Sequence, residues 1–279
     1  MTLLGDNVDA TATFITTRGD TIVYDDLGPA GAPTVVFVTG AGPDRAEDPT
    51  TLATAERLAT HGVRAFFADR LGRGESTSAG AITLDAQLDA IVELADTAEA
   101  PVVLVGHSSG CAIALLAAPR LSSLAGVVLW EAPLGLFPQG APEWWAAVRT
   151  SIEAGNLEDA VAGYMEGMPP EWLEQLKASP AYPQVVLGWV PDGEALALVE
   201  HRGYSDALGG ITAPMLALTG TETFPGMSET AQALAAATPE GSAEQLLGSE
   251  HSWDPDAMAQ RLATLLRTES GPTGVRTGW

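Results

Sequence analysis

The segment Gly106–Gly110, which reads Gly-His-Ser-Ser-Gly, limits what this chain can fold into more than any other feature. It follows an apolar run at residues 102–105 and opens a helical run at residues 111–118. A serine between two glycines at a strand-to-helix turn occupies a cramped backbone, where a Cβ on either neighbour would clash. Such a turn lifts the Ser108 hydroxyl above the sheet and aims helix amides at negative charge beside it. A chance Gly-x-Ser-x-Gly is the alternative, but the flanking strand and helix favour a nucleophile elbow.

The composition limits the size of the core and the choice of partners. The 279 residues are 46% apolar, enough for one large core plus insertions. Thirteen basic residues stand against 36 acidic ones, and the net charge of −23 would repel phosphate backbones and anionic membranes. We therefore expect neither nucleic acid nor a membrane as a partner. Strongly anionic substrates are also disfavoured, unless Arg70 or Arg73 offsets the charge locally.

The sequence predicts a soluble, cytoplasmic protein. No stretch approaches the roughly 20 apolar residues that a membrane helix requires. Residues 1–10 include Asp6 and Asp9 and lack a basic-then-apolar secretory pattern. The single cysteine, Cys111, excludes an internal disulfide and any multi-cysteine metal site, and it is expected to be a small buried residue.

Strand and helix patterns alternate along most of the chain. An N-terminal hairpin is expected at residues 13–17 and 21–24, and buried strands follow at 34–38, 63–68, 102–105, 125–130, 215–219 and 243–247. Amphipathic helices lie between them, and a last helix has Asp254 as its N-cap and Pro255 at its first position. This alternation predicts an α/β fold with a mostly parallel sheet flanked by helices. Catalytic groups should gather at the carboxyl ends of the strands.

The alternation stops between about residues 132 and 210, where the pattern is helical and rich in aromatic residues. We interpret residues 132–210 as an inserted helical cap, and residues 1–131 with 211–267 as the core. Most of the aromatic side chains should form the cap's own small core, while a few line an apolar pocket. Residues 268–279 have no periodicity and are expected to be a disordered tail.

With this elbow, this alternation and this insertion, the chain resembles the α/β-hydrolase family over roughly residues 11–267. The resemblance implies an α/β-hydrolase fold, with a nucleophile after strand five and a histidine after strand eight. His251 follows the last predicted strand and matches that histidine. A loop histidine is otherwise commonly structural, and solvated or capping roles are sufficient for His61 and His201 near predicted helix ends.

The acid of the implied triad has two candidates. After strand seven, the family's usual place, the chain reads Gly-Thr-Glu-Thr, with Thr223 where an aspartate is common and Glu222 beside it. A neutral threonine cannot stabilise an imidazolium. Strand six, however, ends at Glu131. A carboxylate at this place resembles the arrangement in the haloalkane dehalogenases that carry a glutamate after strand six and in lactone hydrolases of the zearalenone-cleaving type. We favour Glu131; the alternative is that its carboxylate only anchors the first loop of the cap.

The resemblance also implies an oxyanion hole built from two backbone amides. The amide of Ser109 is one, and the amide of Ala41 is the other, in a Thr-Gly-Ala-Gly segment in which Thr39 replaces the family's usual histidine. An ordinary flexible turn is the alternative for this segment. The glycine-rich loop at residues 69–76 is assigned a structural role.

These residues together predict a serine hydrolase that acts on a small-molecule substrate. His251 would deprotonate Ser108, which would attack the acyl carbon of a small, neutral, partly apolar ester or lactone. Serine at the elbow argues against dehalogenase or epoxide hydrolase chemistry, which needs a carboxylate there. No cofactor or metal is expected. Carbon–carbon bond hydrolases, lyases and perhydrolases on the same triad remain open, as does a non-catalytic ligand-binding homologue, and the oligomeric state is open, a homodimer included.

Overall fold

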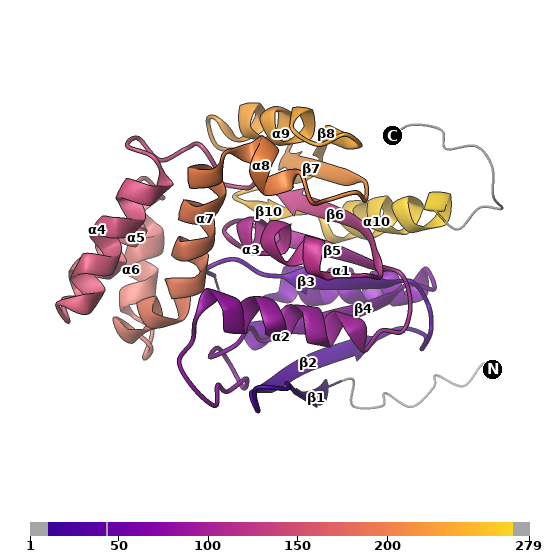
Figure 1. Ribbon diagram of the computed structural model, residues 1–279, viewed down its shortest axis with the longest axis horizontal. Helices are drawn as coiled ribbons and strands as arrows, with labels where there is room; N and C mark the ends of the chain where they lie inside the picture. The colour runs from indigo at the N-terminus through magenta and orange to yellow at the C-terminus, as the bar shows by residue number, and fades with distance from the viewer. Residues whose placement is uncertain (1–10, 43, 270–279) are drawn as a thin grey trace.

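A computed structural model describes residues 11–42 and 44–269, and an eight-stranded sheet runs through its centre (Figure 1). The strand order is β1-β2-β4-β3-β5-β6-β7-β8. The strands are β1 Thr11–Ile15, β2 Thr21–Leu27, β3 Thr34–Val38, β4 Arg64–Ala68, β5 Val102–His107, β6 Leu124–Trp130, β7 Met215–Gly220 and β8 Gly241–Leu246. β2 pairs antiparallel with β1 and β4, and the other neighbours are parallel. The predicted mostly parallel sheet with an N-terminal hairpin is therefore confirmed.

Helices cover both faces of the sheet, which explains why every residue of β3 and β7 is buried. Five helices flank the sheet: α1 Pro49–Thr60, α2 Leu84–Asp96, α3 Gly110–Ala117, α9 Met227–Ala236 and α10 Pro255–Glu269. On one face, Leu58 of α1 and Leu262 of α10 pack against Val35 and Val128. The other face carries α2, α3 and α9. No helix among the described residues is both long and apolar enough to cross a bilayer.

The C-terminal boundary differs from the expected one. The expected tail begins at residue 268, but α10 continues to Glu269, so its first two residues are helical. The buried side chains of Leu262, Leu265 and Leu266 extend the apolar face of α10 almost to that end, which accounts for the difference. Residues 270–279 lie outside the described residues.

Six short helices lie between β6 and β7: α4 Ala141–Glu153, α5 Leu157–Tyr164, α6 Pro170–Lys177, η3 Gln184–Trp189, α7 Val190–Arg202 and α8 Tyr204–Leu208. In Figure 1, α4, α5 and α6 gather beyond one end of the sheet, and α7 stands between them and the rest. This segment has a core of its own that includes Trp145, Tyr164 and Trp189. Leu196 of α7 instead packs into the main core beside α3, so α7 ties the insertion to the sheet.

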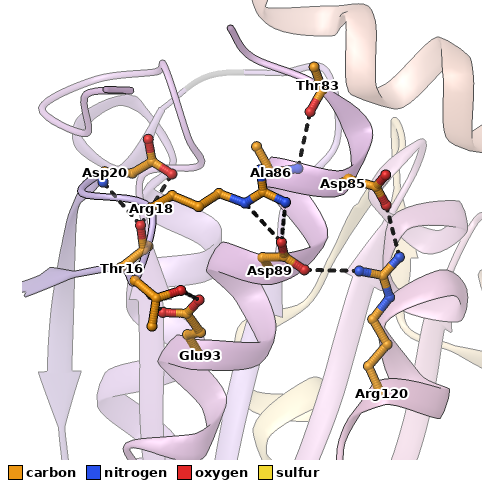
Figure 2. A network of polar contacts seen from close by, with 10 residues as sticks. Thr16, Arg18, Asp20, Thr83, Asp85, Ala86, Asp89, Glu93 and Arg120 are labelled. Carbon is orange, nitrogen blue, oxygen red and sulfur yellow. Dashed lines mark hydrogen bonds and ion pairs between the residues drawn. The ribbon is translucent and has the colours of Figure 1, made fainter. Parts of the chain in front are cut away.

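A surface network ties the N-terminal hairpin to α2 (Figure 2). Arg18, in the β1–β2 turn, donates two hydrogen bonds to Asp89 at 2.9 and 2.5 Å. Arg120, in the 3₁₀ turn η2 Ala118–Arg120, reaches Asp89 and Asp85 at 3.0 Å each. Because these side chains are partly or largely exposed, each pair contributes little to stability. The network joins the hairpin turn, α2 and η2, and it includes none of the predicted catalytic residues.

Candidate active site

Ser108 stands at the sharp turn between β5 and α3. Its φ of 54° lies in the left-handed region, which a residue with a side chain adopts only where the surroundings enforce it. The Ser108 amide donates to the carbonyl of Trp130 at 2.9 Å, which joins the turn to the end of β6. The sheet register pairs His107 with Trp130, so Ser108 and Glu131 leave neighbouring strands side by side.

The glycines of the motif are required by close backbone approach. A Cβ on Gly106 would lie 2.6 Å from the Cα of Cys111, and one on Gly110 would lie 2.2 Å from the carbonyl oxygen of Val38. Gly40, in the loop after β3, is as tightly placed: a Cβ there would lie 2.8 Å from the Ser108 Cβ. The β3 loop therefore lies directly against the elbow, as an oxyanion hole shared by the two segments requires.

The structure brings His251 to Glu131. The Nδ1 atom of His251 lies 2.6 Å from Oε2 of Glu131, whose side chain is fully buried. The other carboxylate oxygen accepts hydrogen bonds from the Gly220 amide at 3.0 Å and from the Thr223 hydroxyl at 2.5 Å. Glu222, the other candidate acid, is exposed.

The environment of Glu131 keeps its carboxylate ionised. Burial acts to raise the pKa of Glu131, but the hydrogen bonds from His251, Thr223 and Gly220 outweigh burial, and the pKa lies below its ordinary value. A charged carboxylate on Nδ1 holds the imidazole in the tautomer whose proton is on Nδ1. The Nε2 atom is then the nitrogen that can accept a proton.

A two-strand hairpin that the sequence did not reveal presents His251. It pairs β9 Gly248–Ser249 with β10 Ser252–Trp253, and His251 occupies its turn with a φ of 68°. The carbonyl of His251 accepts a hydrogen bond from Trp130 Nε1 and another from His107 Nε2, both at 3.0 Å. Burial, together with repulsion from His251, lowers the pKa of His107 to about 3, so His107 is neutral and acts as a donor here. The buried ring of Trp130 and the partly buried ring of His107 therefore hold the backbone that carries His251.

Aromatic side chains surround the imidazole of His251. Its ring lies 5.0 Å from that of His107, the residue before Ser108, measured between centroids. Trp172 of α6 lies 6.2 Å away and Phe224, after β7, lies 6.0 Å away. Trp172 thus belongs to the few aromatic residues of the insertion that reach the site, whereas Trp145 and Trp189 are buried in the insertion's own core.

Sequence reasoning missed two polar residues of this region. Thr223 replaces the acid that is common at this position, yet its hydroxyl donates a hydrogen bond to Glu131. Asp192 of α7 is the second residue: its carboxylate is completely buried and accepts hydrogen bonds from Arg70, Arg73 and Ser109. An aspartate within the largely apolar run 185–199, where Glu194 is the one other charged residue, was the available signal, since a buried carboxylate needs partners.

Comparison with known proteins identifies the family to which this fold belongs. A family model described as "Alpha/beta hydrolase family" matches residues 35–264. An alpha/beta hydrolase from Sphaerobacter thermophilus superposes with a TM-score of 0.74 at 26% identity, over 91% of this chain and 99% of that one. An enol-lactonase from Burkholderia xenovorans gives 0.63 at 20% identity, over 92% and 100% of the two chains. An esterase from Thermogutta terrifontis gives 0.59 at 22%, over 92% and 96%.

Among curated proteins, Lipase LipV of Mycobacterium tuberculosis is 43% identical to this chain over 70 residues. That stretch covers 24% of this chain and 27% of the length of the lipase. The solved structures share the fold over nearly their whole length, and the family model spans most of the sequence. The resemblance inferred from the elbow is thereby confirmed, and this chain belongs to the alpha/beta hydrolase family.

Proposed function

We propose that this chain is a serine hydrolase that cleaves a small, neutral, partly apolar carboxylic ester or lactone through an acyl-enzyme. The observation that carries the proposal is the 2.6 Å contact between His251 Nδ1 and the buried Glu131 carboxylate, beside an elbow that holds Ser108 at a φ of 54°. A nucleophile, a base and an orienting carboxylate are the three groups that this chemistry needs.

The proposed reaction uses these three groups in turn. His251 Nε2 takes the proton of the Ser108 hydroxyl as the Oγ atom attacks the acyl carbon, and Glu131 stabilises the imidazolium that forms. The oxyanion accepts hydrogen bonds from the amides of Ala41 and Ser109. Collapse of the tetrahedral intermediate passes the proton from His251 to the leaving alkoxide and forms the Ser108 ester. Water, deprotonated by the same imidazole, then attacks that ester and releases the acid.

The surroundings favour a neutral substrate with an apolar part. The ring centroids of Trp172 and Phe224 lie 6.2 and 6.0 Å from that of His251, so an apolar group of the substrate can pack beside them. The net charge of −23 disfavours anionic substrates by long-range repulsion. The esterase, enol-lactonase and lipase among the similar proteins support ester or lactone cleavage as the reaction class. The proposed mechanism requires no metal or cofactor.

A substrate panel tests the proposal. Initial rates are measured on p-nitrophenyl esters of increasing acyl length, on γ- and δ-lactones, and on vinylogous diketones, with Ser108→Ala as the matched control. We expect hydrolysis of at least one ester or lactone, no cleavage of the diketones, and a loss in Ser108→Ala on the order of 10,000-fold or more. Diketone cleavage without ester or lactone hydrolysis, or turnover that survives in Ser108→Ala, would overturn the proposal.

A further inference from the structure

A buried cluster of charges connects the insertion to the elbow. Asp192, near the start of α7, accepts hydrogen bonds from Arg70 at 2.7 and 3.1 Å and from Arg73 at 2.6 Å. The Asp192 side chain is completely buried, and the side chains of Arg70 and Arg73 are at least nine-tenths buried. Two cations on one carboxylate leave a net charge of +1 in a region of low dielectric. Burying such a cluster costs free energy of desolvation, which indicates a role beyond folding stability.

The two arginines of the cluster contact the loop after β3. Arg70 Nη1 donates to the carbonyl of Thr39 at 2.9 Å, and Arg73 Nη1 donates to the carbonyl of Gly40. The carbonyl of Gly40 and the amide of Ala41 belong to the same planar peptide group, in which C=O and N–H point in opposite directions. A guanidinium fixed on the carbonyl therefore sets the direction of the Ala41 N–H. It also polarises the peptide group, which makes that N–H a stronger donor.

The aspartate of the cluster contacts the elbow. The Ser109 hydroxyl donates to Asp192 Oδ1 at 2.7 Å, and Ser109 is the residue whose amide forms the second half of the proposed oxyanion hole. Arg73 also donates to the carbonyl of Gly188, in the insertion, at 2.9 Å. One carboxylate on α7 is thus linked through Arg73 to the peptide group that carries the first amide, and through the Ser109 hydroxyl to the residue that carries the second.

We propose that Asp192 and Arg73 are positioning residues for the oxyanion hole, which they align and polarise from the insertion. This inference rests on the proposed function, because it concerns charge that develops only after Ser108 attacks. The net positive charge behind the two amides adds to their effect, since it favours the oxyanion over the neutral carbonyl. Burial, with repulsion from Arg70, lowers the pKa of Arg73 to about 10, so Arg73 remains charged at neutral pH.

The same contacts would also be present if these residues only stabilised the packing of α7 against the sheet. The experiment must therefore distinguish a loss of folding stability from a loss of transition-state stabilisation. Arg73→Lys keeps the charge but replaces the planar fork with a single ammonium group, which cannot reach Gly40, Gly188 and Asp192 together. Arg64→Lys is the matched control: Arg64 forms a two-bond pair with Asp26 at 2.7 and 2.6 Å at the start of β4, away from the elbow.

The readouts are kcat, KM and the Ki of a trifluoromethyl ketone, which forms a tetrahedral adduct with serine hydrolases, together with Tm. For Arg73→Lys we expect kcat to fall about 10- to 100-fold, KM to change less than about 3-fold, and the Ki to rise by the same factor as kcat falls. Arg64→Lys should lower Tm and leave the other three values unchanged. A kcat and Ki for Arg73→Lys equal to those of the wild type would refute the inference, as would equal losses in Arg64→Lys.

A second variant keeps the inference testable if Arg73→Lys does not fold. Ser109→Ala retains the amide but removes the hydroxyl that holds Asp192, and its kcat should fall about 3- to 10-fold with an unchanged KM. Wild-type kcat in Ser109→Ala would also count against the inference. An inactive wild-type protein would refute the proposed function and this inference with it, whereas an active wild type with fully active variants would refute this inference alone.

Discussion

The imidazole of His251 meets the carboxylate of Glu131 across 120 residues of sequence, with Nδ1 and Oε2 2.6 Å apart. Glu131 is the first residue after β6, and its φ of 47° turns the chain sharply out of the sheet. Thr223, from the loop after β7, donates to the other carboxylate oxygen at 2.5 Å. The residue at the family's usual acid position, Thr223, therefore donates a hydrogen bond to a carboxylate that comes from the end of the neighbouring strand.

Replacement of Glu131 by Gln should reduce kcat about 1,000- to 10,000-fold, because a neutral amide neither stabilises the imidazolium nor fixes its tautomer. Glu222→Gln is the matched control, since Glu222 is an exposed carboxylate close in sequence to Thr223. It should retain kcat within about 2-fold of the wild type. Steady-state kinetics on the best substrate of the panel checks both variants. A larger loss in Glu222→Gln would show that the acid is wrongly assigned.

The hydroxyl of Thr223 should matter because it donates to Glu131. Thr223→Val removes that hydrogen bond and should lower kcat about 3- to 10-fold and the free energy of unfolding by about 1–3 kcal/mol. Thr223→Ser keeps the donor and should remain close to the wild type.

Thr223→Asp tests the same position in the opposite sense. It restores the residue common in the family, but its carboxylate would face Glu131, and repulsion between like charges would raise the pKa of one of them. We expect lower kcat at neutral pH than in Thr223→Ser. Activity above that of the wild type would contradict the role given to Glu131.

The lowered pKa of Glu131 implies a pH-dependent contribution to stability. Because the folded-state value lies below the ordinary 4.5, the unfolded chain binds more protons in the window between the two values, and stability falls as pH falls through it. Urea unfolding of the wild type and of Glu131→Gln, from about pH 7 to about pH 3, isolates this contribution. The stability advantage of the wild type should be largest above the ordinary value and shrink on acidification. An advantage that stays constant or grows on acidification would contradict the assignment.

Trp172 should influence substrate binding more than chemistry, since it faces His251 from α6. Trp172→Ala should raise KM for esters with a bulky apolar acyl group about 10-fold, while kcat changes less than about 3-fold. Trp172→Phe keeps an aromatic face and should have an intermediate KM. An unchanged KM across the acyl series would mean that Trp172 lies outside the substrate's reach.

The parts of the fold that local patterns encode could be predicted from the sequence. Apolar strands before Ser108 and Glu131, and the glycines around Ser108, leave clear local signals, and the mostly parallel sheet followed from them. The boundary of α10 differed by two residues, because the end of a helix depends on how far its neighbours bury it.

The links between distant segments could not be predicted in the same way. The hairpin that carries His251 is held by Trp130 and His107 through contacts with its backbone carbonyl, which leave no periodic signal. The pairing of Asp192 with Arg70 and Arg73 joins residues separated by 122 and 119 positions. Only the folded chain shows that these residues meet.

Covalent labelling by a fluorophosphonate tests whether Ser108 is an activated nucleophile, because the reagent reacts with a serine whose hydroxyl is activated by a nearby base and whose adduct is held by an oxyanion hole. Intact-mass measurement followed by peptide mapping should find one adduct on Ser108 in the folded wild type, none in Ser108→Ala, and a much slower reaction in His251→Ala. No adduct on the folded wild-type protein, or an adduct on another residue, would contradict the account.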